Sequence, residues 1–513
     1  MTQNEHIYSS AGVTPAIPLE QTILFYDARA AGAGKTYAEC NNMLQHAGLY
    51  ILAVELIDGM AERHAMLNDI SARIGAHPEI IEVSSSHATT MEAKRGPSVK
   101  AQIEALCGTY EAGHVIALVT HAGLMDADLS GFQNWNLVID EVPSVFESKS
   151  VASALTWQWL GGHFQITPGD DLNGVVLGEA SKATTADFRR DSLATALATF
   201  HRRVASPQYD VFADICAWDA LAEDPRWRWA SFWSPAQLGS FRRVKFLANA
   251  FDRSLTYAVF RARHPELAWQ RDELPTTRTF VRRLMKVHFF ARAHRASRGL
   301  FNAVRGKRNL EVISKWIARS RGSDGHIWMC NEADKASLRR MPGVKLAPRQ
   351  AGSNRYQHVD AVTALYTAKP EPAECQILEA CGIDPSTAIE TREYETIYQF
   401  VGRSSVRDAS SSREVNVYVY DIGQANYLFD IFSAAGYIDV ELWPVDLGFI
   451  DEKFDSKAGR PKCELTESEV AEKKDLRRAQ ARERQRLKRA RDKMVRDHNN
   501  EYFLKRVGNA ELA

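Results

Sequence analysis

Short runs of apolar residues alternate with segments of helical periodicity along the first 140 residues. The strand-like runs occupy residues 22–26, 50–54, 80–83, 115–120 and 137–139. Apolar residues at helical spacing lie between these runs, namely Met66, Leu67, Ile70, Ile74, Val99, Ile103 and Leu106. This alternation predicts an α/β domain with a parallel sheet wrapped by helices on both faces. Ligands of such sheets bind beyond the carboxyl ends of the strands.

The same alternation begins again near residue 327. Strands are predicted at residues 327–330, 344–347, 362–366 and 415–420, and helices at 389–400 and 424–432. Two such domains in tandem account for a chain of 513 residues better than one very large sheet.

The first strand-like run leads into a small-residue loop that ends in Gly32, Ala33, Gly34, Lys35 and Thr36. Glycines let backbone N–H groups close around phosphate oxygens, and the N-terminus of the helix predicted over 37–46 adds positive potential. In this motif the lysine reaches the β and γ phosphates and the threonine ligates Mg²⁺. The eight-residue form of the motif has glycine where Arg29 stands. The loop therefore predicts ATP and Mg²⁺, and a glycine-rich turn before an ordinary helix is the alternative.

An acidic pair, Asp140 and Glu141, directly follows the strand predicted at 137–139. At a strand's carboxyl end such a pair divides two tasks, because Asp140 would hold Mg²⁺ while Glu141 orients and deprotonates the attacking water. The alternative is that the pair caps the N-terminus of a helix. Together with the glycine loop, the pair predicts a site for triphosphate hydrolysis.

Composition narrows the function classes. Lysine plus arginine equal aspartate plus glutamate at 64 each, so any nucleic-acid surface must be local. The seven cysteines form no CxxC pair, which argues against a disulfide framework and a zinc site and fits a reducing cytoplasm. Residues 1–18 contain no apolar signal core, and no run is long enough to cross a bilayer. We expect a soluble cytoplasmic protein without membrane contact.

Further motifs follow in a fixed order along residues 20–450. Gln21 precedes the first strand, and Thr120-His121 follows the fourth. The later motifs are Phe246-Leu247-Ala248-Asn249-Ala250-Phe251, Gly352-Ser353-Asn354-Arg355-Tyr356, and a segment from Gln399 that contains Arg403 and Arg407. With the glycine loop and the acidic pair, this order resembles the superfamily 2 helicases of the DEAD/DEAH-like group, in particular divergent phage, prophage and plasmid members.

The resemblance implies two RecA-like domains and an ATP-dependent helicase or translocase. It implies that Gln21 contacts adenine and that Gln399, Arg403 and Arg407 complete catalysis, the arginines as arginine fingers. It also implies that Thr120, His121, Asn354 and Arg355 contact nucleic acid. Two departures are visible: only Ala248 survives of the Ser-Ala-Thr coupling motif, and the two arginines are one residue further apart than usual. An ordinary turn at 352–356 and a surface salt bridge for the two arginines are the alternatives.

On this basis the chain divides into five parts. They are a flexible N-terminus at 1–18, a first RecA-like domain at 19–258 with an insertion at about 146–244, a helical connector at 259–320, a second RecA-like domain at 321–455, and a basic helical or disordered tail at 456–513. The predicted fold class is thus α/β, with two tandem parallel-sheet domains, a helical insertion and a basic helical tail.

Three segments carry clustered basic residues. The insertion combines Trp157, Trp159, Trp218, Trp227, Trp229 and Trp233 with Arg189, Arg190, Arg202, Arg203, Arg226 and Arg228. Such interleaving suits stacking on single strands, and packing in a helical core is the alternative. A helix is predicted over 279–308, and it carries a basic face of Arg282, Arg283, Lys286, His288, Arg292, His294, Arg295, Arg298 and Arg305. This face is either a track that contacts phosphates or a solvated surface. Residues 466–505 form a basic helix without an apolar stripe, for which polyanion binding is favoured over a solvated helix.

Three functions are compatible with these features. The first is a nucleic-acid-stimulated ATPase that acts on DNA, with RNA not excluded, and has replication or mobile-element proteins as further partners. The second is a non-catalytic or regulatory nucleic-acid-binding factor with a degenerate helicase fold, which the altered coupling motif and arginine spacing favour. The third is a phage-type packaging ATPase, but the acidic nuclease cluster of that class has no counterpart after Gly436.

Overall fold

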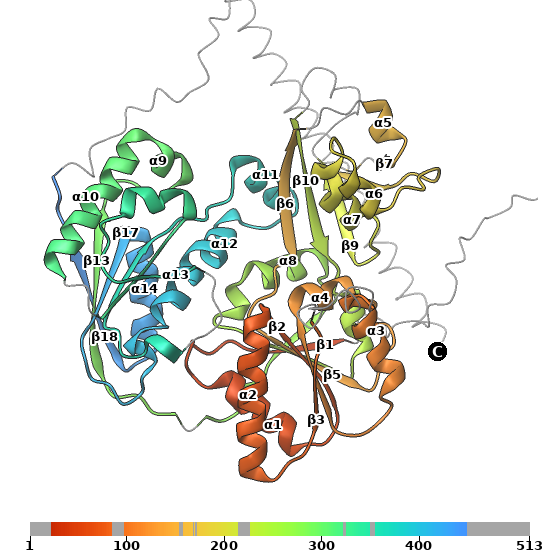
Figure 1. Ribbon diagram of the computed structural model, residues 1–513, viewed down its shortest axis with the longest axis horizontal. Helices are drawn as coiled ribbons and strands as arrows, with labels where there is room; N and C mark the ends of the chain where they lie inside the picture. Colours follow the sequence, from red (N-terminus) through yellow and green to blue (C-terminus); the bar gives the residue numbers. More distant parts are fainter. Residues whose placement is uncertain are drawn as a thin grey trace, which may run out of the picture. The chain divides into compact units, whose positions relative to one another are not determined.

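The computed structural model describes residues 22–84, 97–152, 157–167, 169, 172–213, 226–276, 278–321, 325–348 and 354–448 (Figure 1). The chain divides into two compact units, residues 1–451 and 452–513. All of the described residues belong to the first unit. Gln21, the N-terminus at 1–18, Gly352, Ser353 and the predicted tail at 456–513 lie outside the described residues.

The first sheet has seven strands in the order β12-β1-β11-β5-β2-β4-β3, and every neighbouring pair is parallel. Its strands are β1 (Ile23–Asp27), β2 (Leu49–Val54), β3 (Glu79–Glu82), β4 (Val115–Thr120), β5 (Trp135–Asp140), β11 (Arg243–Leu247) and β12 (Ala268–Arg271). The helices of this part are α1 (Lys35–Gln45), α2 (Ile57–Ile74), α3 (Val99–Thr109), α4 (His121–Asp126) and α8 (Leu255–Arg263). The first five strands confirm the predicted sheet, whereas β11 and β12 were not predicted.

The insertion is built on a five-stranded antiparallel sheet in the order β6-β10-β9-β8-β7. Its strands are β6 (Phe146–Ala152), β7 (Phe164–Thr167), β8 (Asn173–Leu177), β9 (Tyr209–Ala213) and β10 (Arg226–Trp233), and its helices are α5 (Trp157–Gly161), α6 (Thr185–Arg190) and α7 (Ala198–Val204). The helices were predicted but the sheet was not. Trp227, Trp229 and Trp233 are at most 3% exposed, so core packing, and not stacking on a nucleic acid, accounts for these three side chains.

The second parallel sheet has six strands in the order β15-β14-β16-β17-β13-β18. These are β13 (Arg283–Ala291), β14 (His326–Cys330), β15 (Val344–Lys345), β16 (Ala361–Leu365), β17 (Val415–Asp421) and β18 (Ile438–Pro444). The helices are α9 (Arg298–Asn302), α10 (Val304–Ser320), α11 (Pro372–Ala380), α12 (Pro385–Ile389), α13 (Glu395–Val401) and α14 (Ile422–Ala434). Two tandem parallel-sheet α/β parts confirm the predicted fold class, while the exact domain boundaries stay a prediction.

One prediction in this region was wrong. Residues 279–308 were expected to form a basic helix, but β13 occupies Arg283–Ala291 and pairs with β17 and β18. Met285, Val287 and Phe289 are buried while Lys286 and His288 between them are partly exposed, which is the period-two pattern of a strand. The basic residues are therefore distributed over a strand, a loop and the start of a helix and do not form one helical face.

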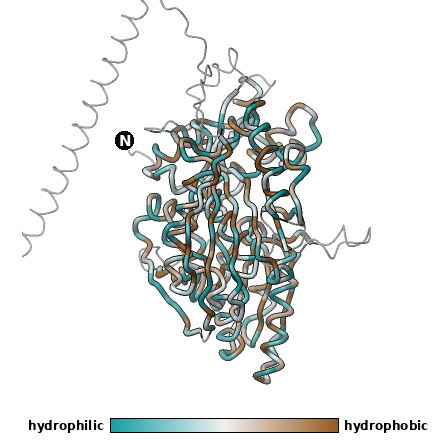
Figure 2. The backbone as a smooth tube through the Cα atoms, turned by 90° about the vertical axis from the view of Figure 1, so that its left-hand side faces the viewer, coloured by the Kyte–Doolittle hydropathy of each residue, from teal (hydrophilic) through white to brown (hydrophobic). Residues whose placement is uncertain are grey.

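Central strands of both sheets are buried along their whole length, as β2 and β17 illustrate. This burial on both faces is typical of parallel sheets covered by helices. Figure 2 shows hydrophobic stretches running through the interior of the described chain. Among the described residues, no helix combines the length and the apolar character that a membrane span requires.

Candidate nucleotide site

The glycine loop lies between the carboxyl end of β1 and the start of α1, whose first residue is Lys35. Gly32 and Gly34 have φ angles of 83° and 86°. Side chains with a Cβ rarely adopt this left-handed conformation, so glycine is needed at both positions. The N–H groups in the first turn of α1 have no partner within the helix, and together with the loop they form a potential anion-binding concavity.

Lys35 folds back over its own loop. Its Nζ donates hydrogen bonds to the carbonyl oxygens of Arg29, at 2.6 Å, and Ala30, at 3.1 Å. Burial lowers the pKa of this ammonium group, and the charges of Glu141, Asp27 and Asp140 oppose that effect. A bound triphosphate would replace the two carbonyl groups with phosphate oxygens as partners of Nζ.

Arg29, which stands where the full motif has glycine, does not fill the loop. Its Nε lies 2.9 Å from Oδ1 of Asp27, the last residue of β1, and its guanidinium forms an ion pair with the same carboxylate. The side chain thus has a partner on its own segment. The departure from the motif is compatible with an open loop.

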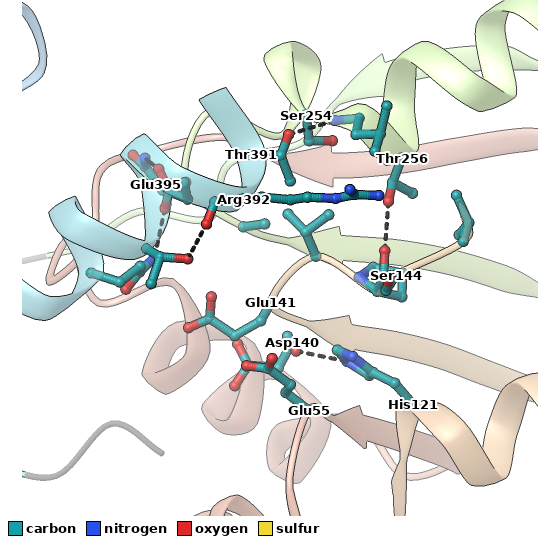
Figure 3. Close-up of a pocket in the computed structure, with 18 of the residues that line it drawn as sticks. Glu55, His121, Asp140, Glu141, Ser144, Ser254, Thr256, Thr391, Arg392 and Glu395 are labelled. Atoms are coloured by element: carbon teal, nitrogen blue, oxygen red, sulfur yellow. Dashed lines mark hydrogen bonds between the residues drawn. The ribbon is translucent and has the colours of Figure 1, made fainter. Parts of the chain in front are cut away.

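The acidic pair lies at the carboxyl end of β5, next to this loop (Figure 3). The hydroxyl of Thr36 donates to Oδ1 of Asp140 at 2.8 Å, and Nε of Arg63 on α2 donates to Oδ2 at 2.7 Å. Hydroxyl and carboxylate oxygens are hard ligands of the kind that Mg²⁺ prefers, and magnesium sites often use only one or two protein ligands together with phosphates and water. Thr36 and Asp140 therefore fit a Mg²⁺ ion carried by a nucleotide. No group of three or more His, Cys, Asp or Glu residues that could hold a metal occurs in the described part of the chain.

Glu141 has a φ angle of 73°, although it is not a glycine. Its backbone N–H donates to the carbonyl of Leu247 on β11 at 3.0 Å, which holds this conformation. Non-glycine residues in the left-handed region are uncommon and concentrate at functional sites. Burial first, and then the charge of Asp140, raise the pKa of the Glu141 carboxyl to about 7, against the opposing effects of Lys35 and Arg63. A carboxyl near this value can accept a proton at neutral pH.

Thr120 and His121 lie behind the acidic pair. Nε2 of His121 is 3.0 Å from the carbonyl oxygen of Asp140, which can only accept, so Nε2 carries the proton. Burial lowers the pKa of His121 to about 4, and the ring is neutral at physiological pH. The Thr120 hydroxyl accepts from the N–H of Gly123 and caps α4. In this structure His121 forms part of the wall around Asp140 and is only 6% exposed.

Helices and loops of the second α/β part supply the opposite wall of the same cavity, whose volume is about 750 Å³. Gln399, Arg403 and Arg407 line it together with Gly32, Asp140 and Glu141. Thr36 donates a hydrogen bond to Asp140, which lines the cavity. The structure thus brings together the predicted phosphate loop, acidic pair and closing motif, although Gln399 follows Glu141 by 258 residues in the sequence.

Two backbone carbonyl groups hold the guanidinium of Arg403. Nη1 of Arg403 donates to the carbonyl of Ala347 at 3.1 Å, and Nη2 to that of Pro348 at 3.3 Å. Burial and the nearby charge of Arg407 lower the pKa of Arg403 to about 10, so it remains cationic at neutral pH. Burial and the charge of Arg63 lower the pKa of Arg407, while Glu141 opposes this effect. Both guanidinium groups therefore interact electrostatically with Glu141 across the cavity.

Sequence reasoning missed several residues that join the two walls. The hydroxyl of Tyr398 on α13 accepts a 2.9 Å hydrogen bond from the N–H of Ala31 in the loop. Arg278 donates to the carbonyl oxygens of Gly32, at 3.2 Å, and Arg407, at 2.6 Å. These contacts fix the phosphate loop against the segment that carries the arginines.

A further contact across the cavity involves the altered coupling motif. Nδ2 of Asn249 donates to Glu395 at 2.8 Å, and Nε2 of Gln399 donates to the same carboxyl group at 2.8 Å. Burial raises the pKa of Glu395 to about 7. Figure 3 shows Glu395 on the side of the cavity opposite Glu55, Asp140 and Glu141. The position of Asn249 thus supports a link between the two walls even though the usual residues are absent.

The remaining candidates, Asn354 and Arg355, belong to a short 3-10 segment, Asn354–Tyr356. Arg355 is not among the residues that line the cavity. Arg355 is exposed, and its guanidinium lies 5.9 Å from the ring centre of Tyr356. Both residues stay predictions for nucleic-acid contact.

No protein-family model and no curated protein matches the sequence. Several solved structures have a distant similarity to the chain. A structure named XPD in the apo form has 10% identity and a TM-score of 0.48, covering 84% of this chain and 98% of that one. A second XPD helicase structure has 10% identity and a TM-score of 0.48, covering 83% and 97%. The S. tokodaii Xpd4 structure has 10% identity and a TM-score of 0.38, covering 80% and 100%. The chain thus has a distant structural similarity to these three structures, at 10% identity and TM-scores below 0.5.

Proposed function

We propose that the chain is a nucleic-acid-dependent ATPase that binds Mg·ATP in the cavity between its two parallel sheets. The observation that carries the proposal is that Glu141, directly after β5 of the first α/β part, lines one cavity with Arg403 and Arg407, which follow α13 of the second. A general base on one wall and cations on the other suit an in-line attack of water on a γ-phosphate.

Each residue has a role in this proposal. Lys35, the loop N–H groups and the N-terminus of α1 bind the phosphates. Thr36 and Asp140 would hold Mg²⁺, which neutralises charge on the β and γ phosphates when bound. Glu141 orients water and accepts its proton, while Arg403 and Arg407 stabilise charge that develops on the γ-phosphate.

Motion follows from the same arrangement. Because the site is shared by two walls, a triphosphate favours the conformation in which they are close, and hydrolysis removes that preference. We infer that this cycle changes the grip on a nucleic acid and drives translocation or unwinding. DNA is the proposed substrate, with RNA as the alternative, and the basic segment at 466–505 is proposed as an additional contact. The five cysteines in the described part of the chain are free, which is compatible with the proposed cytoplasmic location.

A non-catalytic or regulatory nucleic-acid-binding factor is the second candidate. It is favoured by Ala248-Asn249 in place of the usual coupling motif and by the spacing of Arg403 and Arg407. Such a factor would bind nucleotide without turning it over.

ATP hydrolysis should separate the two candidates. Turnover should rise when single-stranded DNA or RNA is added, and the stimulation should fall between about 50 and 200 mM salt because phosphate contacts release counterions. Phosphate release measured with single- and double-stranded DNA and RNA at both salt concentrations provides the test. Nucleotide binding without turnover under every condition would refute the ATPase and support the factor.

A further inference from the structure

Arg63 is one of the charged residues of the cavity that sequence motifs did not indicate. It lies on α2, and its side chain is 14% exposed. Its Nε donates to Oδ2 of Asp140, while Thr36 occupies Oδ1 of the same carboxylate. The two oxygens of the proposed metal ligand thus have different partners, a fixed cation on one side and a neutral hydroxyl on the other.

This ion pair lies in a part of the cavity where charges are weakly screened. Asp140 is 2% exposed, and the charge of Arg63 also acts on Glu141 and on Arg407. Charges interact more strongly at buried positions than in water, because the effective dielectric constant is lower there. Lys35 adds a further cation that interacts with both members of the acidic pair. Arg63 and Lys35 therefore already offset the negative charge of Asp140.

The consequence differs for free and for nucleotide-bound magnesium. A free divalent cation at Oδ1 would be repelled by Arg63 and Lys35, which oppose the attraction from Asp140 and from the neighbouring carboxyl groups of Glu141 and Glu55. A triphosphate carries several negative charges, so its magnesium complex is anionic and is attracted by the same cations. The arrangement thus disfavours the free cation and favours the same cation bound to a triphosphate.

We propose that Arg63 is the resident countercharge of Asp140, and that it excludes free divalent cations so that Mg²⁺ enters only together with a triphosphate. This inference rests on the proposed function, because it takes Thr36 and Asp140 as the metal ligands. Arg63 is in this sense a positioning residue, since it acts through Asp140 and controls which form of the metal that carboxylate accepts.

The test measures Mn²⁺ binding to the full chain without nucleotide, by electron paramagnetic resonance of the free ion. Arg63→Gln keeps an N–H donor for Asp140 but removes the charge, and it should bind Mn²⁺ at least about tenfold more tightly than the unaltered protein. Arg63→Met, which fills similar space without charge, should behave in the same way if Arg63→Gln does not fold. Arg63→Lys keeps the charge and should bind Mn²⁺ as weakly as the unaltered protein does.

The matched control is Arg73→Gln on the same helix, because Arg73 is 53% exposed and pairs with Asp69 at 2.6 Å. It should leave Mn²⁺ binding unchanged. Equal Mn²⁺ affinity in Arg63→Gln, Arg63→Met and the unaltered protein, while Mn·ATP still binds, would overturn the inference and leave the proposed function standing. If the unaltered protein binds neither Mn²⁺ nor Mn·ATP, the proposed function itself fails. Tighter Mn²⁺ binding by Arg63→Lys would show that geometry, and not charge, excludes the ion, and would also overturn the inference.

Discussion

Replacing Lys35 with alanine should abolish ATP hydrolysis and weaken Mg·ATP binding by at least about tenfold. A hydrogen bond to a charged group contributes roughly 1.5–3 kcal/mol, and Lys35 is the cation that the phosphate loop itself supplies. The change removes Nζ and its bonds to the carbonyl oxygens of Arg29 and Ala30, while both left-handed glycines remain. Binding of a fluorescent ATP analogue and release of phosphate measure the two effects.

Lys100→Ala is the matched control, because Lys100 lies on α3, is 51% exposed and forms an ion pair with Glu104 on the same helix. It should hydrolyse ATP at the unaltered rate. Thermal unfolding of both variants identifies any loss of fold that would mimic loss of binding. Normal hydrolysis by the Lys35 variant would show that the phosphate site has been assigned wrongly.

Replacing Glu141 with glutamine should leave ATP binding intact and lower hydrolysis by about 10²–10⁴-fold, the usual contribution of a general base. Glutamine has almost the same shape, and the bond from residue 141 to Leu247 uses the backbone N–H, so the unusual conformation is retained. The variant should therefore accumulate as a stable complex with ATP. Filter binding of labelled ATP, compared with phosphate release from the same sample, separates binding from turnover.

The pH dependence of the unaltered protein follows from the same group. The pKa of Glu141 is raised to about 7, so the carboxyl is mostly protonated below that value and cannot accept a proton from water. Hydrolysis should rise as pH increases from 6 to 8 and then level off, and the residual activity of Glu141→Gln should lack this rise. Glu379→Gln, on the exposed side of α11, is the control and should keep both the rate and the rise. A Glu141 variant that hydrolyses ATP at the unaltered rate would exclude this residue as the base.

Local patterns predicted the parts of the site that short segments determine. The loop at Gly32 and Gly34, the start of α1 at Lys35 and the pair after β5 all follow from residues adjacent in sequence. The strands of the first sheet up to β5 could be predicted for the same reason, because each combines an apolar run with flanking helical periodicity.

The fold was mispredicted where polar residues alternate with buried ones. In β13, the basic residues Lys286 and His288 alternate with the buried residues Met285, Val287 and Phe289, and a run rich in basic residues is also typical of a helix with a solvated face. The insertion was expected to be helical, yet Arg226–Trp233 forms a strand paired with both β6 and β9. Pairing of this kind joins segments far apart in the chain, and no local period reveals it.

The contacts that complete the cavity are also long-range. Tyr398 meets Ala31 across 367 residues, Asn249 meets Glu395 across 146, and Arg63 meets Asp140 across 77. No local sequence pattern marks any of these residues, and only the three-dimensional arrangement shows the contacts that they make. The ordered motifs predicted Arg403 and Arg407, because their resemblance to a known motif carried information that composition did not.

The central claim is that one wall of the cavity binds the triphosphate and that arginines from the opposite wall complete the catalytic site. The most direct measurement is single-turnover hydrolysis by Arg407→Ala, together with the affinity of this variant for Mg·ATP. Arg413→Ala is the control, because Arg413 is exposed on the loop before β17. Arginines that stabilise charge in phosphoryl transfer contribute about 10³–10⁵-fold to the rate, so hydrolysis should fall at least a hundredfold while the affinity changes little. Hydrolysis at the unaltered rate by Arg407→Ala, and equally by Arg403→Ala, would contradict the claim that the two sheets share one catalytic site.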